Sequence, residues 1–136
     1  MPASLRFVAA LLGAAALAAA ASLLVQRQET KHADAAAATA MTHGGDPEAG
    51  RIAFRTHGCG ACHEVQGQLA QDGQTGPSLD KVGARAFLAG RLANQPDQMI
   101  RWIRHPQSVE PGNGMPDMGV GETDARDIAA YLYTLN

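Results

Sequence analysis

The stretch Cys59-Gly60-Ala61-Cys62-His63 constrains this chain more than any other part of its sequence. The spacing C-x-x-C-H is typical of a covalent attachment site for a c-type haem. In such a site the two thiols add to the two vinyl groups of the haem, and the adjacent histidine reaches the iron from one face. We therefore predict one haem c, attached through Cys59 and Cys62 and ligated by His63.

A C-x-x-C spacing alone also occurs in other kinds of site. A structural zinc site needs about four ligands, whereas this chain has two cysteines and no second C-x-x-C. A redox-active pair of the thioredoxin type is expected within a βαβ pattern, which the surrounding sequence does not show. A simple disulfide or a chance match is the plainer alternative, and the features downstream of the motif argue against both.

The N-terminal residues resemble an export signal. Arg6 is followed by an uncharged run from Phe7 to Val25, and a charged start before an apolar core is typical of such signals. At about 1.5 Å per residue the run is just long enough to cross a ~30 Å hydrocarbon core. Ala19-Ala20-Ala21 before Ser22 offers a cleavage site, yet the apolar run continues beyond it.

We therefore predict that residues 1–25 are a signal peptide or an uncleaved membrane anchor. An anchor would associate the protein with the membrane through residues 7–25, on the periplasmic side of a bacterial inner membrane. Cleavage would leave a soluble periplasmic protein. Haem attachment of this kind is completed outside the bacterial cytoplasm, so both alternatives agree with the motif.

Residues 26–45 contain Ala, Thr, His, Gly and charged residues without a periodic apolar stripe. We interpret them as a flexible linker, and residues 46–136 as one folded domain. The formal net charge of −2 and the absence of a basic stripe give no indication of nucleic-acid binding.

Several helix signals recur along this domain. Asp46-Pro47 is a typical helix start, with an N-cap residue before a proline, and this helix is expected to end near His57. A second helix is predicted from Asp97 to His105. Residues 106–116 are rich in Pro and Gly and are predicted to form an irregular loop. A final helix is expected from about Thr123, with that residue as a possible N-cap.

Further residues are candidates for holding the haem. The Pro77 carbonyl is placed to accept the ring N–H of His63 and so orient it, although it is also compatible with an ordinary turn. Arg85 and Arg91 are candidate partners of the haem propionates, or simply surface arginines. Trp102, the one tryptophan, is expected either against the haem or in the general core.

The loop at residues 106–116 carries a candidate second axial ligand. A methionine thioether held on such a loop can ligate the iron opposite His63, which raises the haem potential relative to two histidines. Met115 and Met118 both qualify by position, and the residues alone leave the choice open.

Over residues 46–136 the chain resembles class I cytochrome c. The shared order is a helix, C-x-x-C-H, G-P-x-L, a helix, P-x-x-x-x-P-G-x-x-M and a closing helix with a tyrosine. The resemblance implies an all-α fold of three to four helices around one covalently bound haem, preceded here by the apolar segment. It implies the proximal ligand, its backbone acceptor, a propionate-binding arginine and the axial methionine at His63, Pro77, Arg85 and Met115.

The resemblance also implies that two helices cross at Gly50, Phe54, Ile128 and Tyr131. Trp102 stands where the family often has a tyrosine near the methionine side of the haem. A hydroxyl-based hydrogen bond to the methionine sulfur is therefore not expected here.

Six-coordinate iron implies a one-electron carrier rather than an enzyme, with redox proteins as donor and acceptor in a respiratory or related chain. A haem c subunit of a larger oxidoreductase is an alternative with the same local chemistry. A gas-binding haem sensor is a third possibility, and it would need an open or weakly held sixth position.

Overall fold

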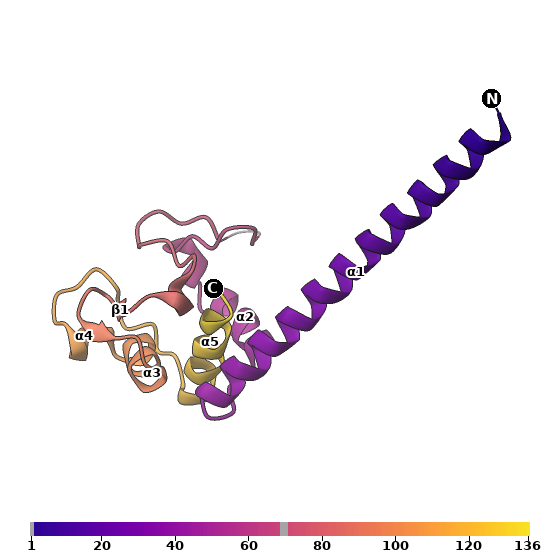
Figure 1. Cartoon of the computed structure of the whole chain (residues 1–136). Coiled ribbons are helices and arrows are strands. Elements are labelled where there is room, and N and C mark those ends of the chain that lie inside the picture. Colours follow the sequence, from indigo (N-terminus) through magenta and orange to yellow (C-terminus); the bar gives the residue numbers. More distant parts are fainter. Residues whose placement is uncertain (1, 69–70) are drawn as a thin grey trace. The chain divides into compact units, whose positions relative to one another are not determined.

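The computed structural model describes residues 2–68 and 71–136. The chain divides into two units, one up to Ala33 and one from Asp34 to Asn136. Most of helix α1 (Ala3–Met41) lies in the first unit, and the second contains the other helices and a short hairpin (Figure 1).

The first unit is helical, and the large apolar side chains of its first half are exposed. Phe7, Leu12 and Leu17 are 66%, 67% and 74% exposed. Among the described residues, α1 is the one helix long and apolar enough to cross a membrane, and an export signal near the N-terminus meets the same criterion. The structure therefore agrees with a signal or an anchor.

Helix α1 continues through Met41, so the prediction of a flexible linker over residues 26–45 is wrong for most of that segment. Alanine has the highest helix propensity, and Gln, Arg, Glu and Lys are close to it. This stretch is therefore a helix former even without an apolar stripe. The Gly44 N–H closes the helix by donating to the Thr39 carbonyl at 2.9 Å, with His43 and Gly44 at positive φ, as in a Schellman motif.

The last turns of α1 belong to the second unit, which therefore begins before the expected Asp46. Ala38 and Thr42 are buried, and the Thr42 hydroxyl donates to the Ala38 carbonyl at 2.7 Å. Gly45 lies so close to the closing helix that a Cβ there would be 2.6 Å from the Arg126 carbonyl oxygen. Residues 34–45 thus add buried contacts to the second unit.

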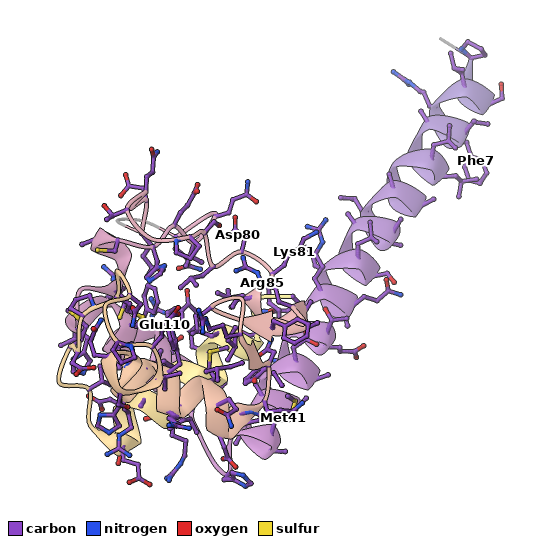
Figure 2. The ribbon with its side chains drawn as sticks, turned by 90° about the vertical axis from the view of Figure 1, so that its left-hand side faces the viewer. Phe7, Met41, Asp80, Lys81, Arg85 and Glu110 are labelled. Carbon is purple, nitrogen blue, oxygen red and sulfur yellow. The ribbon has the colours of Figure 1, made fainter. Side chains whose placement is uncertain are left out.

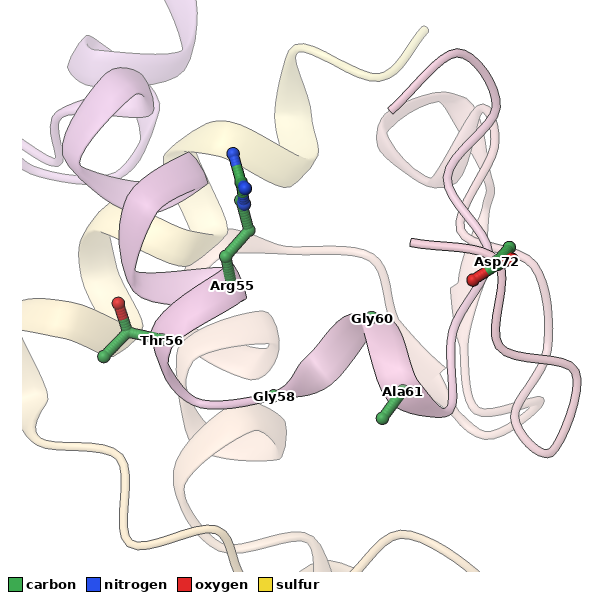
Figure 3. Close-up of a pocket in the computed structure, with 6 residues that line it drawn as sticks. All are labelled: Arg55, Thr56, Gly58, Gly60, Ala61 and Asp72. Atoms are coloured by element: carbon green, nitrogen blue, oxygen red, sulfur yellow. The ribbon is translucent and has the colours of Figure 1, made fainter. Parts of the chain in front are cut away.

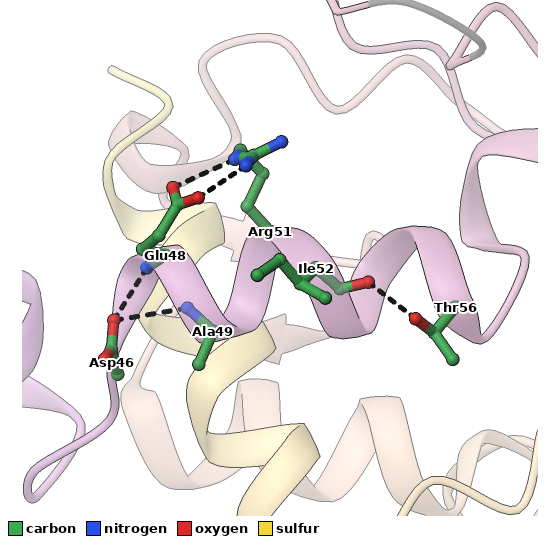
Figure 4. Close-up of polar contacts among 6 residues, drawn as sticks. All are labelled: Asp46, Glu48, Ala49, Arg51, Ile52 and Thr56. Atoms are coloured by element: carbon green, nitrogen blue, oxygen red, sulfur yellow. Dashed lines mark hydrogen bonds and ion pairs between the residues drawn. The ribbon is translucent and has the colours of Figure 1, made fainter.

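Helix α2 (Pro47–Thr56) begins as the sequence predicts (Figure 4). The Asp46 carboxylate accepts from the backbone N–H groups of Glu48 and Ala49 at 2.8 and 3.2 Å, which satisfies donors that have no partner within the helix. Glu48 pairs with Arg51 one turn later. The helix ends before Gly58, which adopts a left-handed φ of 72°.

Helix α5 (Glu122–Tyr133) packs against α2 (Figure 1). At their closest approach a Cβ on Gly50 would lie 1.8 Å from the Asp127 carbonyl oxygen. One turn on, the rings of Phe54 and Tyr131 meet edge to face with centroids 5.7 Å apart. With Ile128, which is 1% exposed, these are the crossing residues that the resemblance implies.

Thr123 is not the N-cap of α5, contrary to our expectation. The first i→i−4 bond runs from the Ala125 N–H to the Gly121 carbonyl at 2.9 Å, which makes Gly121 the cap and places Thr123 inside the first turn. Gly121 has extended backbone angles and no side chain with which to cap. The acidic residues of the first turn, Glu122 and Asp124, instead stabilise the positive helix end.

Helix α3 (Pro96–Arg104) buries Met99 and Ile103. It occupies the predicted position, one residue earlier at each end. Helix α4 (Pro106–Val109) is a short turn of helix within the loop that we expected to be irregular. Pro106 is at its first position, where the backbone N–H that proline lacks would have no partner within the helix. The next three residues contain no further proline.

Two 3₁₀ turns, η1 (Cys59–Ala61) and η2 (Val82–Ala84), and a hairpin of β1 (Phe87–Leu88) with β2 (Leu92–Ala93) complete the domain. Asn94 ties this hairpin to its neighbours. Its amide donates to the carbonyls of Val82 and Arg85 at 2.9 and 2.7 Å, and its oxygen accepts from the Tyr133 hydroxyl at 2.9 Å. Two-residue strands leave the predicted all-α class unchanged.

Candidate functional site

The C-x-x-C-H motif folds as a tight turn directly after α2. The backbone N–H groups of Cys62 and His63 both donate to the Cys59 carbonyl, at 3.2 and 2.9 Å. This turn brings both sulfurs and the imidazole to the wall of one cavity. The three residues that the motif assigns to the haem therefore face a common space.

That cavity has a volume of about 630 Å³ and is walled by every helix from α2 to α5 except α4. Its apolar lining includes Phe54, Leu88, Met99, Ile103, Ile128 and Leu132. Ligand pockets of this size with mostly apolar walls and a few polar groups suit a flat organic cofactor. Seven of the candidate haem-binding residues line it, namely Cys59, Cys62, His63, Pro77, Arg85, Trp102 and Met115, whereas Arg91 does not.

The imidazole of His63 is held by the loop that follows it. Its Nδ1 donates to the Pro77 carbonyl at 2.8 Å, which leaves Nε2 as the nitrogen available to a metal and raises its basicity. The Gly76 N–H donates to the Cys62 carbonyl at 2.8 Å. A Cβ on Gly76 would be 2.6 Å from a ring carbon of His63, so glycine is needed for the loop to lie against the ring.

Two methionines reach the same cavity from the loop after α4. Met115 is partly buried and Met118 is 41% exposed, and both line the wall. The backbone of Met115 is bonded on both sides: its N–H donates to the Asn113 side chain and its carbonyl accepts from Gln107, each at 2.7 Å.

The two candidate arginines differ in their surroundings. One terminal nitrogen of Arg85 donates to the carbonyls of Ser78 and Asp80 at 2.6 and 2.8 Å, which fixes the guanidinium at the cavity wall, beside Asp80 and Lys81 in Figure 2. Arg91 pairs with Glu110 at 3.0 Å and is not among the lining residues of the cavity. Arg85 is therefore the better placed of the two for an anionic group.

The pKa of the Cys59 thiol differs from that of the thiols in a redox-active C-x-x-C pair. Burial raises the pKa of Cys59 to about 11, whereas reactive C-x-x-C thiols have a lowered pKa. Within residues 2–68 and 71–136, no three His, Cys, Asp or Glu side chains cluster as metal ligands. The raised pKa of Cys59 therefore does not favour a redox-active pair.

A second, more open depression beside the motif is lined by Arg55, Thr56, Gly58, Gly60, Ala61 and Asp72 (Figure 3). Its lining contains two charged side chains and no large apolar side chain that could pack against a flat ring. The 630 Å³ cavity is therefore the candidate site.

The family model of cytochrome c matches residues 47–136. This chain belongs to the cytochrome c family. The match covers the capped start of α2, the C-x-x-C-H turn, the methionine loop and α5. The protein is thus a class I c-type cytochrome, and Cys59 and Cys62 stand at the positions that carry the covalently bound haem c of this family.

Curated relatives agree. Cytochrome c2 of Rhodopila globiformis is 33% identical over 67% of this chain and 94% of its own length. Cytochrome c oxidase subunit 2 of Alkalihalophilus pseudofirmus is 37% identical over 63% of this chain, and that of Bacillus subtilis is 30% identical over 62%. The chain spans only about a quarter of these two oxidase subunits. No solved structure matches significantly.

The residues present fit a haem c. The two thiols and the imidazole share one wall, the lining is apolar, Gly76 leaves the imidazole unobstructed, and Arg85 supplies a positive charge at the cavity. Sequence reasoning missed Gly76, Asn94, Gln107 and Asn113, whose roles are steric or consist of side-chain bonds to the backbone. The Gly-Pro pair at 76–77 was the one available signal, because a glycine there implies a close approach of the backbone.

Proposed function

We propose that this cytochrome is a one-electron carrier that works on the periplasmic side of a bacterial inner membrane. Haem c supplies the Fe(III)/Fe(II) couple. In this proposal His63 and Met115 are the axial ligands, Pro77 orients His63, Arg85 pairs with a propionate, and Trp102 packs against the ring. The observation that carries the proposal is the position of all these groups around one apolar cavity.

Two axial ligands from the protein would leave no open position at the iron. A substrate or a gas then has nowhere to bind, and the apolar wall keeps water away, so that electron transfer requires little rearrangement. Met115 is favoured over Met118 because its backbone is bonded on both sides, whereas Met118 is 41% exposed.

The test is spectroscopic. We expect the oxidised protein to show the near-infrared charge-transfer band between a methionine sulfur and ferric iron. We also expect the reduced protein to resist carbon monoxide at concentrations that saturate a five-coordinate haem protein. A missing band together with ready binding of carbon monoxide would instead indicate a gas-binding haem.

A second candidate function is that of a haem c subunit in a larger oxidoreductase. It is favoured by the oxidase subunits 2, which match this chain over about a quarter of their length. The cytochrome c2 matches over nearly its whole length and favours the free carrier. Purification from membranes in mild detergent separates them, since a carrier is expected alone and a subunit in a stable complex.

In the same proposal residues 7–25 are an uncleaved anchor. We expect the full chain to stay with washed membranes, and a chain that begins at Asp34 behind a cleavable export signal to be soluble and redox-active. A matched chain that begins at Asp46 loses buried Ala38 and Thr42 and is expected to be less stable by about 1–2 kcal/mol. Thermal unfolding compares the two, and native protein that starts near Ser22 would contradict the anchor.

A further inference from the structure

Two side chains hold the methionine loop. Gln107, on α4, donates to the carbonyls of Asn113 and Met115 at 3.0 and 2.7 Å and accepts from the Gly112 N–H at 3.0 Å. Asn113 donates to the carbonyls of Pro106 and Glu110 at 2.9 and 2.6 Å, and accepts from the Met115 N–H at 2.7 Å. Both amides are thereby satisfied almost completely.

These bonds replace the backbone ladder that the loop lacks. Between α4 and α5 the described backbone has no strand or helix, so its carbonyls and N–H groups need other partners. The two peptide groups on either side of the Met115 Cα are each bonded to one of the two amides. The position of that Cα therefore depends directly on Gln107 and Asn113.

The two amides are themselves anchored to the domain. Gln107 follows Pro106, whose side chain is among the most completely buried, and its own backbone N–H lies 3.4 Å from the Asp117 carboxylate. Helix α4 packs against α3, which contributes Met99, Trp102 and Ile103 to the cavity wall. The loop is thus fixed relative to the same wall that surrounds the haem site.

We propose that Gln107 and Asn113 are positioning residues that hold Met115 at the iron and set how rarely it leaves. The inference rests on the proposed function, which assigns Met115 as the ligand. A methionine–iron bond is retained only if the thioether is already placed, because the chain entropy of ordering a free loop opposes it. Each backbone-bonding amide reduces that entropy loss.

Three substitutions test the side-chain bonds of Gln107 and Asn113. Gln107→Ala removes three of them, and we expect weaker methionine ligation: loss of intensity in the near-infrared band and an increase in carbon monoxide affinity on the order of tenfold or more. Leucine has a volume similar to that of asparagine, and Asn113→Leu removes the bond to the Met115 N–H. This variant should therefore also weaken the band and raise the carbon monoxide affinity. Asn113→Asp keeps that acceptor and should retain more of the band than Asn113→Leu.

Gln95→Ala is the matched control, since Gln95 is an exposed glutamine of the same domain whose side chain makes no cap bond. It should leave the band, the potential and the carbon monoxide affinity unchanged. All measurements use the full haem-loaded protein, with circular dichroism at the same temperature to show that each variant is folded. A purely structural role would lower the unfolding temperature and leave the band of the folded protein intact.

Two results would overturn the inference in distinguishable ways. If the parent protein shows no band, Met115 is not the ligand, and both the proposed function and this inference fail. If the parent shows the band, and folded Gln107→Ala and Asn113→Leu keep the same band and the same carbon monoxide affinity, the inference alone fails.

Discussion

Replacing Met115 with alanine is expected to abolish the near-infrared band, lower the reduction potential and allow carbon monoxide to bind the reduced protein. The change removes the thioether through which this residue would bind the iron, and the backbone bonds to Gln107 and Asn113 keep the loop in its place. A potential falls when a thioether is lost because the thioether favours ferrous iron over ferric iron. Spectroelectrochemistry of the parent and the variant measures the band and the potential, and titration of the reduced proteins with carbon monoxide measures the third effect.

Met118→Leu is the matched control for that experiment. The two methionines are on the same loop and line the same cavity, but Met118 is 41% exposed. A volume-conserving apolar exchange usually costs less than about 1.5 kcal/mol, so the band and the potential should hardly change. If the band instead survives in Met115→Ala and disappears in Met118→Leu, the assignment of the two residues must be reversed.

Gly50→Ala is expected to destabilise the protein by about 3 kcal/mol or more. On an isolated helix the same change is favourable by up to about 1 kcal/mol, so helix propensity predicts the opposite sign. The added Cβ would lie 1.8 Å from the Asp127 carbonyl oxygen and 2.8 Å from the Ile128 nitrogen. Both are backbone atoms of α5, and the two helices must therefore move apart.

Urea unfolding of the haem-loaded protein, followed by far-ultraviolet circular dichroism, measures this cost. Gly121→Ala is the control, because a Cβ there meets nothing within 4 Å and an alanine at an N-cap costs roughly 1 kcal/mol. A Gly50→Ala protein as stable as the parent would show that the helices do not cross where the structure places them.

Much of this domain follows from its sequence. The C-x-x-C-H spacing identifies the cofactor, and the Asp46-Pro47 start predicts α2 because a capped helix end depends on residues next to each other in the chain. The pair His63 and Pro77 was also predicted, and the structure places their atoms 2.8 Å apart. Local chemistry and a strong motif were sufficient in these cases.

The remaining features depend on partners that are distant in the chain or on weak local signals. Residues 26–41 are helical because their individual helix propensities add up, although no apolar stripe indicates a helix there. Helix α4 is a single turn within a Pro-rich stretch. Asn113 looks like an ordinary turn residue until its amide is seen to bond three backbone groups. The second unit begins at Asp34, and Gly45 lies directly against α5. No pattern within residues 34–45 indicates that contact.

The partner of α2 is the last helix of the chain. The Asp46 N–H donates to the Asp127 carboxylate across 81 residues, and Gly50 meets the same turn of α5. Contacts of such long sequence separation form late and slow the folding of a domain. Until α5 has been synthesised and has packed onto α2, the face of α2 that it covers stays open beside Cys59 and Cys62. We therefore expect thioether formation to have access to the motif before the domain closes. We also expect a chain that ends short of Glu122 to keep its complete attachment motif without closing around it.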